Sequence, residues 1–106
     1  MKEKVVVVHR SVIEGWISNS NPPFPTTLAI DALTRINTVA ESMLPEDVII
    51  VDESPDTGFV SLPDRVGREN SARLYGARAA YCLKIARIVL EDAGIPVILN
   101  VKGCLP

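Results

Sequence analysis

The amino-acid sequence predicts an α/β fold with a small, mainly parallel sheet of three or four strands, built as β-α-β-α-β with right-handed crossovers. Three short runs, residues 4–8, 48–51 and 96–101, are apolar almost throughout and lack the polar alternation of a half-exposed strand. Longer segments separate these runs, and each is long enough for a parallel crossover. We therefore expect the 106 residues to form a single α/β domain spanning residues 1–106.

Composition narrows the class of protein. The hydrophobic fraction of 47% and the charged fraction of 23% are ordinary for a globular protein. The net charge of −2 argues against a nucleic-acid partner. No apolar run approaches the roughly 20 residues that a membrane-spanning helix requires, and the first run is too short for a secretory signal. We expect a soluble, cytoplasmic protein without a membrane partner. Its two cysteines, Cys82 and Cys104, are expected to be free thiols.

Polar residues follow the first strand directly. Ser11 and Glu14 have the spacing of a capping box, which predicts a short helix through Trp16 or Ile17. The next segment, residues 18–25, contains three prolines in its last four positions, which favours an extended loop.

A helix is expected from Thr26 or Thr27 to about Leu44. Its apolar residues recur at the spacing of one helical face and are Leu28, Ala32, Leu33, Ile36, Val39, Ala40 and Met43. The polar residues that fall on the opposite side of this helix are Asp31, Arg35, Thr38 and Ser42.

Acidic residues follow the second strand. Asp52 and Glu53 come directly after residues 48–51, and Asp56 lies in the loop beyond them. Residues 59–62 could add a short fourth strand at the edge of the sheet.

A long helix is expected from Arg68 to about Ala93, where Gly94 and Pro96 end it. About 26 residues at a rise of 1.5 Å give roughly 39 Å, more than twice the ~17 Å of a five-residue strand. The helix should therefore overhang the sheet.

Arg78 falls on the apolar face of that helix, where its neighbours are Leu74, Cys82, Ile85 and Val89. A buried guanidinium needs a carboxylate or phosphate partner, because an unpaired buried charge is very costly. The structural interpretation is an ion pair with Asp52 or a guanidinium that extends outward at an interface, and we favour it. The functional interpretation is a bidentate contact between Arg78 and an anionic ligand.

Several polar side chains should gather where the carboxyl ends of the strands meet, the edge at which open α/β sheets bind ligands. His9 could act there as a general acid or base, with Asp52 and Glu53 as catalytic carboxylates. Asp52 and Asp56 could hold Mg²⁺. The residues that could bind a small anionic ligand, for example a phosphorylated one, are Arg10, Ser11, Arg78 and Lys102.

Known motifs are incomplete in this chain. Residues 48–53 look like a Walker B strand, but no GxxxxGK[ST] loop precedes them. The layout of residues 51–100 is similar to that of zinc-dependent cell-wall amidases, yet Ser54 or Pro55 stands where that family has a zinc-binding His. Because the chain contains one His, the sequence does not predict a three-ligand zinc site, and we assign the chain to no family.

Two kinds of function fit these residues. In the first, the protein binds a small anionic ligand at the carboxyl edge of the sheet, where metal-assisted hydrolysis could also take place. In the second, it is a non-catalytic interaction subunit or inhibitor, with Trp16 and Phe24 as aromatic anchors. Two main helices are few for two faces of a sheet. Either they split between the faces or a second copy covers one face, and we expect a homodimer.

Overall fold

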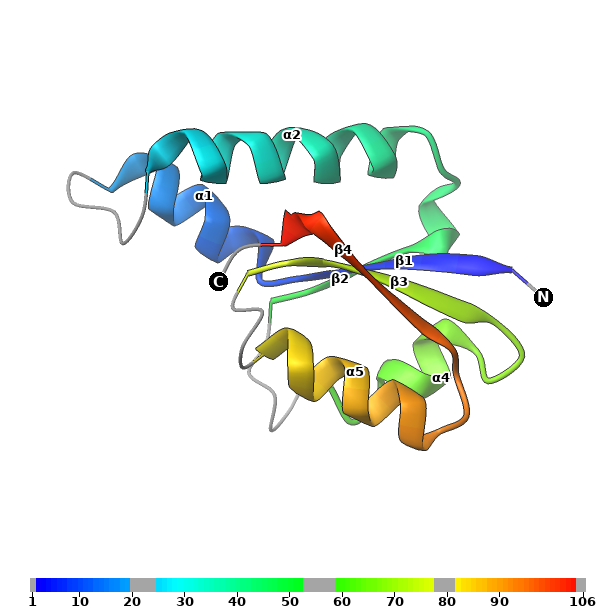
Figure 1. Cartoon of the computed structure of the whole chain (residues 1–106). Coiled ribbons are helices and arrows are strands. Elements are labelled where there is room, and N and C mark those ends of the chain that lie inside the picture. The colour runs from blue at the N-terminus through cyan, green and yellow to red at the C-terminus, as the bar shows by residue number, and fades with distance from the viewer. Residues whose placement is uncertain (1, 20–24, 53–58, 78–81, 105–106) are drawn as a thin grey trace.

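A computed structural model describes residues 2–19, 25–52, 59–77 and 82–104, with the backbone alone for residues 100–104. Strands and helices alternate along the chain, and the helices form a layer on each side of the sheet (Figure 1). In chain order the elements are β1 (Glu3–Val8), α1 (Arg10–Ser18), α2 (Thr26–Glu41), the 3-10 turn η1 (Pro45–Asp47), β2 (Val48–Val51), α4 (Leu62–Val66), β3 (Ser71–Gly76), α5 (Cys82–Asp92) and β4 (Val97–Cys104).

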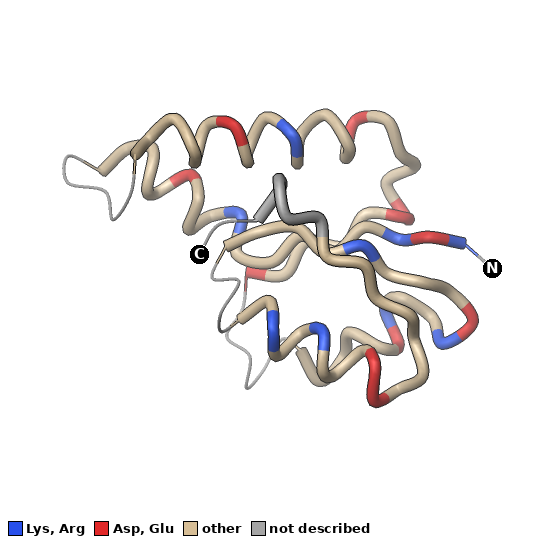
Figure 2. The backbone as a smooth tube through the Cα atoms, viewed as in Figure 1, with Lys and Arg blue, Asp and Glu red and all other residues tan. Residues whose placement is uncertain are grey.

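The four strands form one parallel sheet in the order β2-β1-β3-β4. β1 lies inside the sheet, where Val5 is level with Val48 of β2 and with Arg73 of β3. The charged residues of β1 lie at its start, and the stretch from Val5 to Val8 is uncharged and buried (Figure 2). The predicted α/β fold with a mainly parallel sheet is therefore confirmed.

The prediction of a long helix over residues 68–93 is wrong. Residues Ser71–Gly76 form the strand β3, and the helix after it is the much shorter α5, Cys82–Asp92. The overhang, which depended on the length of that helix, is wrong with it. The additional strand of the sheet is therefore β3, whereas residues 59–61 make a turn and Leu62 begins α4.

Local alternation and two glycines explain this difference. Ala72 and Leu74 are fully buried on one face of β3, whereas Arg73 between them is half-buried on the other face, which is the period of a strand. Gly67 and Gly76 have φ angles of 89° and 135°. An α-helix requires negative φ, so neither residue continues one.

Asn70 fixes the start of β3. Its side chain is buried, where Nδ2 donates to the carbonyl of Val66 at 2.8 Å and Oδ1 accepts from the backbone N–H of Lys2 at 3.0 Å. The backbone N–H of Ser71 also donates to the carbonyl of Lys2, at 2.8 Å. The end of α4 is thereby joined to the beginning of β1, and β3 starts in register beside it.

The helices split between the two faces of the sheet (Figure 1). α1 and α2 cover the face with Val5, Val7 and Tyr75, and α4 and α5 cover the face with Val6 and Leu74. One chain therefore supplies helices to both faces, which is the first of the two expected ways to cover the sheet. The homodimer stays a prediction. The crossover from β1 to β2 runs one way across the sheet, over the α1–α2 face. The crossovers from β2 to β3 and from β3 to β4 run the other way, over the α4–α5 face. All three crossovers therefore have the same hand.

Two hydrophobic cores result from this arrangement. The larger one lies between the sheet and α4–α5 and contains Phe59, Leu62 and Leu83; Cys82 is buried there, as expected, as a free thiol. The smaller one lies under α1 and α2 and contains Ile13, Ala29 and Ile36. Trp16 packs partly against this smaller core, and Phe24 lies outside the described residues.

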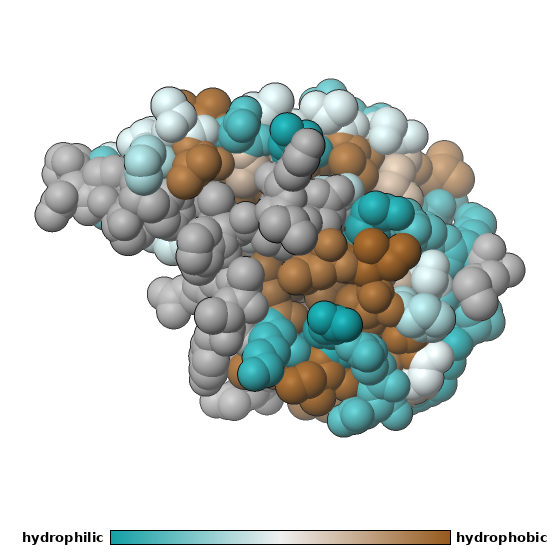
Figure 3. Space-filling model, in the orientation of Figure 1, coloured by the Kyte–Doolittle hydropathy of each residue, from teal (hydrophilic) through white to brown (hydrophobic). Residues whose placement is uncertain are grey.

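The two outer edges of the sheet, β2 and β4, differ in how they are covered. At β2, the Arg65 guanidinium donates to the outward carbonyl of Ile50 at 3.4 Å. At β4, Ile98 is 47% exposed, and apolar side chains form the brown area between α2 and α5 in Figure 3. None of the helices within the described ranges is long and apolar enough to cross a membrane.

Gly76 should be among the least replaceable residues of the fold. A Cβ at this position would overlap the backbone of Val8, and the φ of 135° is itself strained for any other residue. We expect Gly76→Ala to lower the free energy of unfolding by about 2 kcal/mol or more. Urea denaturation monitored by circular dichroism measures this change.

Gly15→Ala is the matched control. Gly15 is exposed within α1, and a Cβ there meets nothing within 4 Å. Its replacement should raise stability by up to about 1 kcal/mol, because Ala favours the helix. Equal effects of the two substitutions would contradict the close approach of β3 to β1.

Candidate functional site

The carboxyl edge of the sheet contains a topological switch point. The chain leaves β1 toward β2 on one side and later returns to β3 on the other, so the strand order reverses between β1 and β3. In open α/β sheets a crevice forms at such a point, outside the carboxyl ends of the strands. His9, Asp52 and Ala77 follow the three strands that meet here.

Backbone hydrogen bonds join the three strands up to this edge. The N–H of His9 donates to the carbonyl of Val51 at 2.8 Å, and the N–H of Ala77 donates to the carbonyl of Val8 at 3.0 Å. Because Gly76 has no side chain, β3 can approach Val8 this closely. The first residues beyond β1, β2 and β3 are therefore held side by side.

Asp52 and Ser11 are brought together at this edge. Asp52 Oδ1 accepts hydrogen bonds from the backbone N–H of Ser11 at 3.2 Å and from Ser11 Oγ at 3.0 Å. Ser11 lies in the first turn of α1, whose N-cap residue is His9, with a left-handed backbone at φ 56° and no capping side chain. The predicted capping box at Ser11 is therefore wrong, and a carboxylate from the neighbouring strand satisfies the helix start.

This arrangement limits what Asp52 and Ser11 can do chemically. Asp52 supplies negative charge at the positive end of α1, the place that a bound anion would otherwise occupy. Ser11 donates directly to the carboxylate, so a histidine does not stand between them as it does in a nucleophile–base relay. We read the pair as a structural helix cap.

His9 and Arg10 are engaged with neighbours. His9 is 8% exposed, and its ring centroid lies 6.4 Å from that of Phe59. Arg10 is half-buried, and its Nε lies 3.3 Å from Oε1 of Glu14, one turn along α1. The catalytic role predicted for His9 and the ligand-binding role predicted for Arg10 stay predictions.

The other predicted site residues cannot be placed by their side chains. Glu53, Asp56 and Arg78 lie outside the described residues, and Lys102 is described by its backbone, within β4. The proposed pairing of Arg78 with Asp52 therefore stays a prediction. Within the described part of the chain, no group of three His, Cys, Asp or Glu residues could hold a metal ion.

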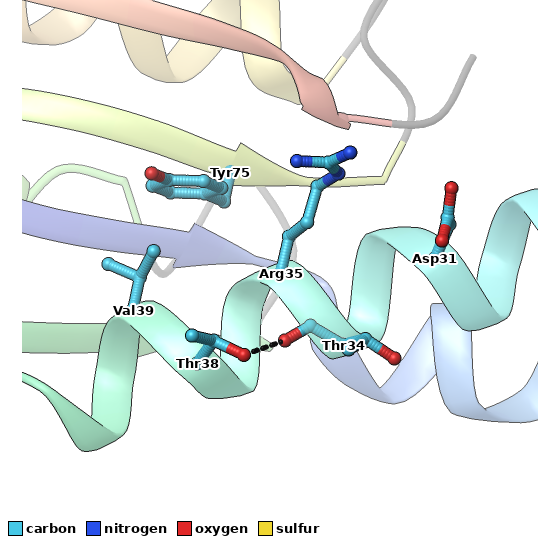
Figure 4. A pocket seen from close by; sticks show the side chains of 6 residues that line it. All are labelled: Asp31, Thr34, Arg35, Thr38, Val39 and Tyr75. Carbon is cyan, nitrogen blue, oxygen red and sulfur yellow. Dashed lines mark hydrogen bonds between the residues drawn. The ribbon is translucent and has the colours of Figure 1, made fainter.

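A groove lies on the α1–α2 face of the sheet, between α2 and β3 (Figure 4). Its volume is about 400 Å³, and the described residues that line it are Asp31, Thr34, Arg35, Thr38, Val39 and Tyr75. Asp31 and Arg35 extend from α2 toward the strands, and Tyr75 lies across from them beside Val39. The sequence analysis did not identify this site.

Arg35 is the cation among the described residues that line this groove. Among the residues that the structure describes, it has no hydrogen bond and no ion pair, and its side chain is exposed. Arg73 on the same sheet face differs, because its Nε and Nη2 donate to the two carboxylate oxygens of Glu3 at 2.9 and 3.2 Å. Those hydrogen bonds raise the pKa of Arg73, and its guanidinium is already committed.

The two threonines of the groove present acceptor oxygens. Thr34 Oγ1 donates its hydrogen to the carbonyl of Ile30 at 2.8 Å. Thr38 Oγ1 donates to the carbonyl of Thr34, also at 2.8 Å (Figure 4). With their hydrogens used inside the helix, these hydroxyls can only accept from a molecule in the groove.

Helical periodicity placed Arg35 and Thr38 outside the apolar stripe of α2 but could not show which strand lies across from them. The apolar stripe of α2 packs over residues of β1 and β3, and β4 also lies against this helix. The flank of α2 with Arg35 and Val39 faces Tyr75 of β3 across the groove. Tyr75 could have indicated the opposite wall of the groove, but only after residues 71–76 had been recognised as a strand.

The helix cap makes a specific prediction about Asp52. Asp52→Ala should lower the free energy of unfolding by about 0.5–2 kcal/mol, because it removes both hydrogen bonds to Ser11. Ser11→Ala should cost less, and the double variant should cost less than the sum, since the residues share one interaction. Glu41→Ala, an exposed carboxylate at the end of α2, is the control and should change stability little. Additive effects in the cycle would contradict the cap.

Comparisons with known proteins identify no relative. No protein-family model matches the sequence, and searches of curated proteins and of solved structures give no match. The functional assignment therefore depends on the geometry of the chain itself.

Proposed function

We propose that this protein binds a small molecule through an anionic group, a carboxylate or a phosphate, in the groove between α2 and β3. The observation that carries the proposal is Arg35, whose guanidinium has no partner among the described residues and projects into a concave site against Tyr75. A guanidinium presents donors in a planar fork that matches carboxylate and phosphate oxygens. Small-molecule sites combine such a polar group with apolar walls.

The size and lining of the groove support a small ligand. A volume of about 400 Å³ is near the lower end of the ~300–1,000 Å³ range of small-molecule sites. Tyr75 is 3% exposed and fixed in β3, and Val39 lies beside it on α2, so these packed side chains close the inner end of the groove. The ligand should place its anion at Arg35 and an apolar part against Tyr75 and Val39.

The proposal keeps the anionic ligand expected from the sequence but moves it from the strand ends to the adjoining sheet face. Asp52 already occupies the start of α1, and Arg10 is paired with Glu14, so the described cations at the edge are less available than Arg35. The proposal concerns binding, and assigns no reaction to His9 or Asp52.

A fragment screen by two-dimensional NMR tests this function. The set contains small carboxylates, phosphates, amines and neutral aromatic compounds, each titrated against the ¹⁵N-labelled chain. We expect carboxylates and phosphates to bind preferentially and to shift the backbone signals of residues 34–39 and of Tyr75. Arg35→Gln should weaken these hits roughly ten- to hundred-fold, the usual effect of losing hydrogen bonds to a charged group.

Lys84→Gln is the matched control for Arg35→Gln. Lys84 is an exposed cation on α5, on the opposite side of the sheet, and its loss changes the net charge by the same amount. It should leave affinity and the mapped signals unchanged. Hits that shift other regions, that show no preference for anions, or that weaken equally in both variants would reject the groove as the binding site.

A further inference from the structure

The groove contains a carboxylate as well as a guanidinium. Asp31 and Arg35 are one helical turn apart on α2, a spacing at which such side chains commonly pair. Their charged groups form no ion pair within 4 Å, although both extend from the helix toward the strands (Figure 4). The wall formed by α2 therefore carries one positive and one negative group, each available to a ligand.

The hydrogen-bonding groups of this wall are unequal in number. Arg35 is its charged donor, whereas Asp31, Thr34 and Thr38 present acceptors, since both threonine hydroxyls donate within the helix. A complementary ligand must therefore bring donors as well as an anion. A purely anionic ligand would leave these acceptors unmatched and would be repelled by Asp31.

We infer that the ligand is a small zwitterion of the amino-acid type, an inference that depends on the proposed anion site at Arg35. Its carboxylate would bind Arg35, and its ammonium group would donate to Asp31. Its side chain would lie against Tyr75 and Val39. Because Asp31 and Arg35 together carry no net charge, a ligand with no net charge is the electrostatic complement of the groove wall that α2 forms.

Three related compounds separate the two charges of such a ligand. L-Phenylalanine has both, 3-phenylpropanoate lacks the ammonium group, and 2-phenylethylamine lacks the carboxylate. NMR titration of the full chain should give an affinity for phenylalanine at least about five-fold higher than for either analogue, since one charged hydrogen bond contributes at least this much. The shifted signals should again be those of residues 34–39 and Tyr75.

Asp31→Asn provides the readout that a general loss of structure would not give. The variant should bind phenylalanine about five-fold more weakly and 3-phenylpropanoate as well as or better than the unmodified chain, because a repelling charge is removed. Arg35→Gln should weaken both acids. Glu41→Gln, an exposed carboxylate of α2 that does not line the groove, is the control and should change neither affinity.

The outcomes distinguish the two levels of the proposal. If phenylalanine and 3-phenylpropanoate bind equally well, and Asp31→Asn leaves their ratio unchanged, the zwitterion is overturned while the Arg35-dependent anion site stands. If neither acid binds at the groove, the inference is overturned as well. If, in addition, the fragment screen places no anion at Arg35, the proposed function falls with it.

Discussion

The contact between β3 and the end of β1 is the constraint on which the rest of this structure depends. Gly76 has no side chain, so the chain can pass against Val8 and donate a backbone hydrogen bond from Ala77 to its carbonyl. That contact places β3 on the side of β1 opposite β2, which creates the reversal of strand order. It also fixes the neighbouring Tyr75, with its ring under the flank of α2.

The class of fold could be predicted from the sequence because its strongest signals are local. Uninterrupted apolar runs identified β1, β2 and the start of β4, because the strands of a parallel sheet are buried on both faces. β3 was missed because it is short and because Leu74 happens to share a helical spacing with the residues that do form α5. The positive φ angles of Gly67 and Gly76 contradict a helix, and they belong to the folded backbone.

The candidate site, like the fold, could be predicted from the sequence only in part. Asp52 and Ser11 could be placed near each other from the sequence alone, since residues that follow parallel strands must share an edge. Their direct hydrogen bond, and hence the capping role, depends on the exact position of α1. The groove was beyond sequence reasoning. It lies between α2 and β3, and the pattern of one helix contains no information on the strand below its flank.

Two arginines on the α1–α2 side of the sheet show how a neighbouring carboxylate decides what a guanidinium is available to do. Arg73 is held by Glu3 and links β1 with β3, whereas Arg35, one layer above, has no such partner among the described residues and faces a cavity. The whole account requires that residues 71–76 form a parallel strand between β1 and β4. Backbone chemical shifts with interstrand nuclear Overhauser effects measure this directly. The account predicts extended shifts for Ser71–Gly76 and contacts between the backbones of Val7 and Tyr75. Continuous helical shifts from residue 71 into α5, without those contacts, would contradict it.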